Sequence, residues 1–306
     1  MDSSRETDET MHKRKAAVAM LSVASNSVLV GGKLAVGLMI GSVSVISEAA
    51  HSAMDLVASV IALFAVKTSH KPADEQHPYG HGKVENISGT IEALLIFVAA
   101  GWIIYEAIRK LMHPQEIEAV GWGMAIMAVS AVVNMIVSER LFRVARQTES
   151  VALEADGWHL RTDVYTSAGV GVGLAMIAVG DRLWPHLYWQ WLDPVAALAV
   201  ALLIMHAAWT LTVRSARDLL DVSLPAEELA WLERYLSQPR PSVQGAHDLR
   251  TRRAGNMRFI EFHLAVHRDM SVGDSHALTD VMLADITERF PGASVTIHVE
   301  PCEPDC

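Results

Sequence analysis

The chain has 306 residues, of which 51% are hydrophobic and 20% are charged, a composition too apolar for an ordinary soluble domain of this length. Its formal net charge of −10 argues against nucleic acid as a partner, because binding phosphate groups requires a basic surface. The apolar residues crowd into six long runs before Arg214, and the remaining sequence alternates and carries charge like a soluble protein. These features predict a membrane part followed by a soluble part.

Residues 1–12 are polar and acidic, and we expect a disordered tail there. The tail has no short apolar core followed by a small-residue cleavage site, so no cleaved signal peptide is predicted. A basic cluster at residues 13–15 precedes the first apolar run, which is therefore read as a retained membrane span. At the other end, Cys302 and Cys306 would close only a very small loop, so we expect no structural disulfide.

Each apolar run is long enough to cross the hydrocarbon core of a bilayer, which takes about 20 residues in a helix. The expected spans cover residues 16–40, 43–66, 84–108, 119–137, 151–179 and 193–213. Loops on the side of the N terminus hold most of the lysines and arginines, whereas the other side has only Arg109, Lys110 and Arg182. By the positive-inside rule, both termini are expected in the cytoplasm.

Beyond the last span, the periodicity of the sequence predicts a small α+β domain. A helix is expected at residues 225–236, strands at 243–252 and 258–267, a helix at 271–290 and a strand at 294–300. This gives the order αββαβ. We therefore divide the chain into the tail 1–12, a transmembrane domain 13–214 and a cytoplasmic domain 215–306.

The most informative motif is a His-x-x-x-Asp spacing that occurs in two expected spans, as His51 with Asp55 and His159 with Asp163. On a helix, residues four apart share a face about 6 Å apart along the axis, close enough to hold one ion. A single buried pair of this kind could simply hydrogen-bond one helix to another. Ionisable groups inside spans are costly, and the repeated spacing favours a metal site. Two imidazoles and two carboxylates suit a tetrahedral divalent metal, with zinc first.

The polar loop between the second and third spans holds Asp74, His77 and His81. One carboxylate and two imidazoles in a short, glycine-rich loop could form a three-ligand zinc site completed by water. Histidines in a polar loop are equally often solvated side chains without a ligand. The spacing alone leaves both interpretations open.

The soluble domain is rich in histidine and predicts one or two further metal sites, against the alternative of scattered surface histidines. Two of its histidines lie on adjacent expected strands, where neighbouring side chains can share a metal, and another is four residues before an aspartate on a helix. The candidate ligands are His247, His263, His276, Asp280, His298 and Glu300.

With these motifs assembled, the chain resembles the cation diffusion facilitator family over nearly its whole length. The resemblance lies in residues 47–55, 73–83, 155–167, 193–194 and 247–252. It implies a bacterial transporter in the cytoplasmic membrane, not an enzyme, with six transmembrane helices plus a cytoplasmic ferredoxin-like α+β domain. It further implies a homodimer in the lipid bilayer that exports zinc or a related ion in exchange for protons.

The resemblance also assigns roles to the residues of the motifs. The two intramembrane pairs match the transport site, the loop trio matches a loop site, and His247, His263, His276 and His298 match a regulatory metal cluster at the dimer interface. Lys83 and Asp221 match a charge interlock that holds the family's dimer at the membrane surface. Zinc is thus expected both as transported substrate and as regulatory ion.

Two positions depart from the family's pattern, because His51 and Glu300 stand where the best-known bacterial members have aspartate. An imidazole in place of a carboxylate removes a negative charge and a possible bidentate oxygen ligand, so we expect a narrower preference for zinc over cadmium and manganese. The motifs also leave two other functions open: an intramembrane zinc-dependent hydrolase, and a membrane-tethered metal sensor whose spans only anchor it.

Overall fold

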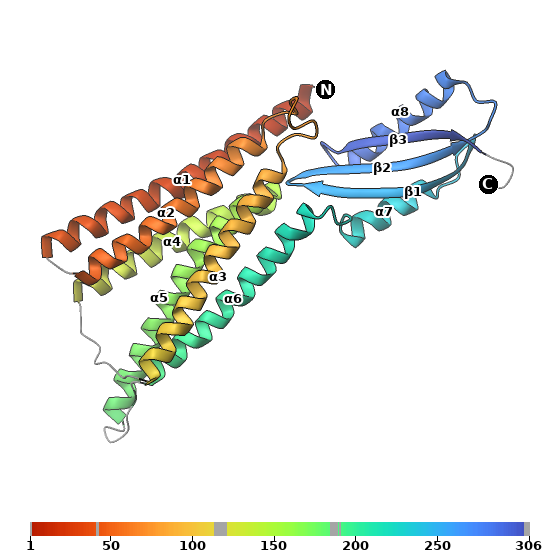
Figure 1. Cartoon of the computed structure of the whole chain (residues 1–306). Coiled ribbons are helices and arrows are strands. Elements are labelled where there is room, and N and C mark those ends of the chain that lie inside the picture. The colour runs from red at the N-terminus through yellow and green to blue at the C-terminus, as the bar shows by residue number, and fades with distance from the viewer. Residues whose placement is uncertain (1, 41–42, 113–120, 184–188, 190, 303–306) are drawn as a thin grey trace.

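The computed structural model describes residues 2–40, 43–112, 121–183, 189 and 191–302. The first part of the chain forms long helices and the last part forms a small three-stranded sheet with two shorter helices (Figure 1). The long helices are α1 (Asp2–Ile40), α2 (Val43–Ser69), α3 (Lys83–Met112), α4 (Gly121–Thr148), α5 (Val151–Leu183) and α6 (Leu192–Leu219).

The long helices pack in a bundle whose contacts join α1 to α2, α3 to α6, and α4 to α5. In Figure 1, α1, α2 and α4 run together, α3, α5 and α6 run together, and the two groups draw apart toward the end remote from the sheet. Small residues permit close approach of these helices. A Cβ on Gly89 of α3 would lie 2.7 Å from the Cγ1 atom of Val151 on α5, so the backbone of α3 packs directly against a side chain of α5.

Helices occur at the positions of all six expected spans. Within the described residues, four segments are long and apolar enough to cross a membrane: Thr10–Met39, His51–Ser69, Lys83–Met112 and Pro194–Leu219. In α5, the segment from Glu154 to Asp163 holds four charged residues, counting both ends, which shortens the apolar stretch of this helix. Both α1 and α4 continue further than the apolar runs predict.

Two expectations about the chain ends are wrong. Residues 2–12, expected as a disordered tail, are helical, because α1 begins at Asp2. Extending an existing helix costs far less than nucleating one, and acidic residues near its start interact favourably with its N-terminal partial charge. Cys302 is disulfide-bonded, whereas no structural disulfide was expected. A small loop reduces the entropic gain from such a bond but does not prevent it. Cys306 lies outside the described residues.

The soluble part has the expected element order αββαβ. Its elements are α7 (Ala226–Leu236), β1 (Val243–Ala254), β2 (Met257–Val266), α8 (Val272–Arg289) and β3 (Ser294–Pro301). The sheet has the order β1-β2-β3, with β1 antiparallel and β3 parallel to the central β2. At the start of α8, the Ser271 hydroxyl accepts a hydrogen bond from the backbone N–H of Asp274 and so caps the helix.

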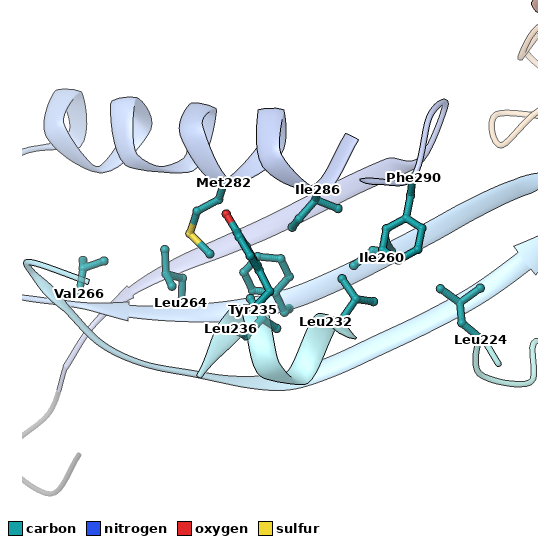
Figure 2. Packing of buried hydrophobic residues seen from close by; sticks show 11 residues of the cluster. Leu224, Leu232, Tyr235, Leu236, Ile260, Leu264, Val266, Met282, Ile286 and Phe290 are labelled. Atoms are coloured by element: carbon teal, nitrogen blue, oxygen red, sulfur yellow. The ribbon is translucent and has the colours of Figure 1, made fainter. Parts of the chain in front are cut away.

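The hydrophobic core of the soluble part lies on one face of the sheet. Alternate residues of β2, from Ile260 to Val266, point to the same side because side chains alternate along a strand. Figure 2 shows this set meeting Met282 and Ile286 of α8 together with Leu232 and other residues of α7. Both helices cover this face, and Glu261 and His263 of β2 therefore lie on the other face of the sheet.

The turn between β1 and β2 docks against the helical bundle. The buried amide of Asn86 on α3 accepts a hydrogen bond from the backbone N–H of Gly255 at 2.9 Å and donates one to Asp218 on α6, also at 2.9 Å. The turn also approaches the backbone before α3 so closely that a Cβ on Gly82 would lie 2.4 Å from the carbonyl oxygen of Ala254. The hairpin, α3 and α6 are therefore joined at one point.

Aromatic packing adds to this junction. Tyr79, from the loop between α2 and α3, packs edge-on against Phe259 of β2 with ring centroids 5.8 Å apart. The guanidinium of Arg252 lies over both rings, 4.8 Å from the centroid of Tyr79 and 4.1 Å from that of Phe259. A cation stacked on aromatic faces is attracted by their negative charge distribution.

A network of charges completes the contact between the bundle and the sheet. Glu149, after the end of α4, forms ion pairs with Arg253 and Arg258. Arg258 also bonds both oxygens of Glu228 on α7, at 2.9 and 2.7 Å. This hydrogen bonding from Arg258 holds the pKa of Glu228 below its ordinary value.

Candidate metal centres

The two intramembrane His-x-x-x-Asp pairs meet at one place between α2 and α5. The Nε2 atom of His159 lies 3.1 Å from Oδ1 of Asp55, and Nε2 of His51 lies 3.8 Å from Oδ1 of Asp163. Ligand atoms of His51, Asp55 and Asp163 all lie within 4.8 Å of one another. The pairs therefore cross over: each histidine faces the aspartate of the other helix.

Exposure differs sharply across this centre. The side chains of Asp55 and His159 are 5% and 11% exposed, while that of His51 is 57% exposed, so the group is closed on one side and open on the other. A small cavity of about 90 Å³ adjoins the open side and is lined by His51, Asp55 and Asp163 together with Lys33 and Asn134.

Two of these lining residues were not among the candidate ligands. The Asn134 amide donates a hydrogen bond to Oδ2 of Asp163 at 3.2 Å and so helps to orient this carboxylate. The ammonium of Lys33 donates to the Ser52 hydroxyl at 2.7 Å, one residue after His51. Each is a polar residue inside an apolar run, which is the signal by which the sequence could have identified it.

A polar network supports the closed side. Asp156, one turn before His159 on α5, accepts a hydrogen bond from the Ser59 hydroxyl at 3.0 Å, and the Asn26 amide donates to the same hydroxyl at 2.7 Å. This chain of bonds ties α1 and α2 to α5. Asp156 Oδ2 and, on α3, Glu92 Oε2 are buried without a hydrogen-bond partner.

The loop trio is also brought together, with ligand atoms of Asp74, His77 and His81 within 4.8 Å of one another. The Asp74 carboxylate lies 3.2 Å from Nδ1 of His77 and 3.3 Å from Nε2 of His81. The backbone N–H groups of His77 and Gln76 bond Oδ1 of Asp74, and the bond from His77 does most to lower the pKa of Asp74 below its ordinary value. Its carboxylate is therefore ionised and able to bind a cation at neutral pH.

In the soluble part, the register of the sheet aligns three histidines on neighbouring strands. His247 of β1 is paired with His263 of β2, which is paired with His298 of β3. The Glu300 carboxylate reaches two of them, lying 3.1 Å from Nε2 of His247 and 3.3 Å from Nδ1 of His263. Ligand atoms of His247, His263 and Glu300 lie within 4.8 Å of one another. The ring centroids of His298 and His263 are 4.6 Å apart.

The other two candidate ligands of the soluble part lie apart from this group. His276 and Asp280 on α8 face each other at 3.8 Å and are largely exposed. Since α8 covers the apolar face of the sheet and His263 lies on the opposite face, these two residues do not join the sheet cluster within one chain. A residue that the sequence did not suggest, Asp248, lies 3.8 Å from His263.

The charge pair expected from the resemblance is present within the chain. Nζ of Lys83, at the start of α3, lies 2.9 Å from Oδ1 of Asp221, just after α6. Arg252 of β1 approaches the same oxygen at 3.6 Å. The pair thus stands at the junction between the bundle and the sheet.

Comparison with known sequences decides the family. The sequence model of the cation efflux transmembrane domain matches residues 19–220, and that of the cation efflux protein cytoplasmic domain matches residues 224–302. The chain belongs to the cation diffusion facilitator family. It is therefore a membrane-embedded metal cation transporter with a cytoplasmic dimerisation domain, and not an enzyme.

Two of the sequence relatives agree with this membership of the cation diffusion facilitators. An uncharacterized transporter of Synechocystis is 35% identical over 93% of this chain and 90% of its own length. The cation-efflux pump FieF of Klebsiella pneumoniae is 31% identical over 94% of this chain and 92% of the pump. Among solved structures, the zinc form of a putative zinc transporter, CzrB, is 42% identical, covering 26% of this chain and 90% of that one with a TM-score of 0.23.

For a cation diffusion facilitator, the donor types of the three groups indicate which ions can be held. Imidazole nitrogens together with carboxylate oxygens suit zinc and other first-row transition metals. Magnesium and calcium prefer shells made of oxygen alone. The residues present therefore fit a divalent transition metal at each group.

Proposed function

We propose that this transporter exports a divalent cation, with zinc first, in exchange for protons, at a site made by His51, Asp55, His159 and Asp163. The observation that carries the proposal is the meeting of the two pairs, with His159 3.1 Å from Asp55 and His51 3.8 Å from Asp163. A pair that only locked two helices would not need its repeat at the same place.

Coupling to protons follows from the chemistry of the ligands. A metal binds only deprotonated imidazole and carboxylate, so the same atoms hold either the dication or protons. Histidine titrates near neutral pH and suits this exchange. Lys33 places a further positive charge beside the cavity, which opposes the dication and favours its release.

Alternating access is proposed to move the helices that carry the pairs. The site is closed around Asp55 and His159 and open at His51, as expected for one of two access states. In Figure 1, the two helix groups approach each other near the sheet and separate at the other end. Rocking one group against the other would open the end near the sheet.

The wider architecture is proposed as follows. All six long helices cross a bacterial cytoplasmic membrane, the domains divide near residue 214, and the ferredoxin-like domain and both termini lie in the cytoplasm. The start of α1 and the sheet stand at the same end of the bundle in Figure 1, which supports this orientation. We further propose that the transporter works as a homodimer, with zinc bound at the loop trio and, as regulatory ion, at the histidine cluster of the sheet.

The proposal is tested by zinc uptake into proteoliposomes with an imposed proton gradient. Asp55→Ala and His159→Ala should each abolish uptake, because each leaves at most three ligands and one unpaired buried partner. His206→Ala is the matched control, since His206 is an exposed histidine on α6 outside the site. Wild-type uptake in either site variant, with the protein folded and inserted, defeats the proposal.

A second experiment addresses the choice of ion. His51→Asp should raise the rate of cadmium uptake relative to zinc, because a carboxylate adds charge and a possible second oxygen ligand. The readout is the ratio of initial rates for the two ions in the same vesicles. An unchanged ratio would show that His51 does not set the preference.

A further inference from the structure

A cavity of about 600 Å³ lies between α4, α5 and α6, away from the three ligand groups. Its walls combine arginines with aromatic rings and include Phe142, Arg146, Trp158, Arg161, Tyr165 and Arg214. Glu149, another lining residue, is bonded to the β1–β2 hairpin, so one end of the cavity is at the junction with the soluble domain.

The depth of the cavity follows from the helix that forms its wall. From Glu154 to Tyr165, α5 advances about 16 Å at 1.5 Å per residue. The cavity therefore runs from the junction, at the level of a membrane surface, to a depth where acyl chains begin. Neighbouring positions of α4, such as Val132 and Ile136, expose apolar side chains as a lipid-facing helix does.

Arg161 is the unusual residue in this wall. Its side chain is only 15% exposed on a helix of the membrane domain, where a charge is costly unless it has a function. It approaches Glu139 at 3.3 Å and lies 5.4 Å from the centre of the Phe142 ring. Its Nε atom is buried without a hydrogen-bond partner. The guanidinium is thus incompletely satisfied by the protein.

The charges around the cavity leave a positive surplus. Arg214 is paired with Glu154, and Arg161 is paired with a carboxylate as described above. The third carboxylate of the wall, Glu149, is engaged by two arginines of the hairpin. Within the part of the chain that the structure describes, Arg146 has no ion pair.

We propose that this cavity binds an anionic phospholipid of the adjoining leaflet, with its phosphate held by Arg146 and Arg161. Guanidinium groups match phosphate oxygens in charge and geometry, and basic pockets between membrane helices bind anionic headgroups. Trp158 and Tyr165 provide the amphipathic rings that suit the interface, beside which the acyl chains descend. The inference uses the membrane embedding of the family and does not depend on which ion is transported.

The two arginines that hold the phosphate come from different helices, so a bound lipid links these helices. Arg146 belongs to α4, whereas Arg161 belongs to α5, so one headgroup contacts both helix groups of the bundle. Bound lipid should therefore hold the two helix groups of the bundle together at the end next to the soluble domain.

The test is native mass spectrometry of the full-length protein in detergent, titrated with phosphatidylglycerol, with phosphatidylcholine, or with glycerol phosphate. Phosphatidylglycerol should bind at least about tenfold more tightly than phosphatidylcholine, as expected when a charged hydrogen-bonded contact is gained. Equal binding of the two lipids overturns the proposal. Binding of glycerol phosphate as tight as that of the lipid also overturns it, because the site would then take a soluble phosphate.

Variants locate the binding. Arg146→Gln and Arg161→Gln should each weaken phosphatidylglycerol binding by about tenfold. Arg143→Gln is the matched control, since Arg143 is an exposed arginine three residues before Arg146 on α4 and does not line the cavity. Arg146 is exposed, so its variant keeps the fold even if Arg161→Gln does not. Unchanged binding in Arg146→Gln, or equal loss in Arg143→Gln, refutes the assignment.

Discussion

Asn86 joins the soluble domain to the membrane bundle, and its replacement gives the sharpest prediction about this junction. Asn86→Ala removes the bonds to the Gly255 N–H and to Asp218, both at 2.9 Å, from a fully buried side chain. Leaving the Gly255 amide buried without a partner costs the docked state about 1–3 kcal/mol, whereas the bond to Asp218 joins α3 to α6 within the bundle and is present in the docked and the undocked state. The docked state should therefore lose about 1–3 kcal/mol.

The assay is hydrogen exchange measured by mass spectrometry on the full-length protein in nanodiscs. A loss of about 2 kcal/mol in the docked state corresponds to about 30-fold faster exchange of the β1–β2 turn, if exchange requires undocking. Gln244→Ala removes an exposed amide elsewhere on β1 and should change exchange at the turn little. Unaltered exchange at Gly255 in Asn86→Ala would refute the view that this amide holds the two parts together.

Other predictions concern the same domain and its ions. Gly82→Ala should lower the thermal stability by about 1–3 kcal/mol because its Cβ would meet the Ala254 carbonyl at 2.4 Å, whereas Gly245→Ala, with open space around it, should be nearly neutral in the same melting assay. Burial and a 2.7 Å hydrogen bond to Asp285 raise the pKa of Tyr235 to about 12. Because this phenol is harder to ionise in the folded state, its contribution to the free energy of unfolding is complete below pH about 10 and is lost as the pH rises through about 12. In denaturant titrations at alkaline pH, the stability of Tyr235→Phe should therefore depend less on pH than that of the wild type. EDTA should weaken association of the soluble domains in sedimentation experiments; unchanged sedimentation counts against a regulatory ion in the sheet cluster.

The sequence located the helices well because an apolar run long enough for a bilayer is an unmistakable pattern. It located their ends poorly. The helix α4 continues to Thr148, past the expected end of its span at residue 137, and Glu149 beyond it is anchored by arginines of the hairpin. Such anchoring depends on contacts distant in sequence, which periodicity does not contain.

The metal groups show the same division between local and distant information. Spacing within a helix identified His51 with Asp55, but only the packing of α2 on α5 shows that each histidine faces the other helix's aspartate. Asp248 could not be foreseen near His263. A register shift in β1 and a positive φ of 52° at Asp248 interrupt the alternation on which strand reasoning rests.

The position of Tyr79 between two candidate ligands of the loop trio has a thermodynamic consequence. This ring packs on Phe259 beneath Arg252, so the backbone that would hold an ion on one side holds the hairpin on the other. Two binding events that share one segment are linked reciprocally. If an ion in the loop raises the hairpin's affinity for the bundle by some factor, a docked hairpin must raise the loop's affinity for that ion by the same factor.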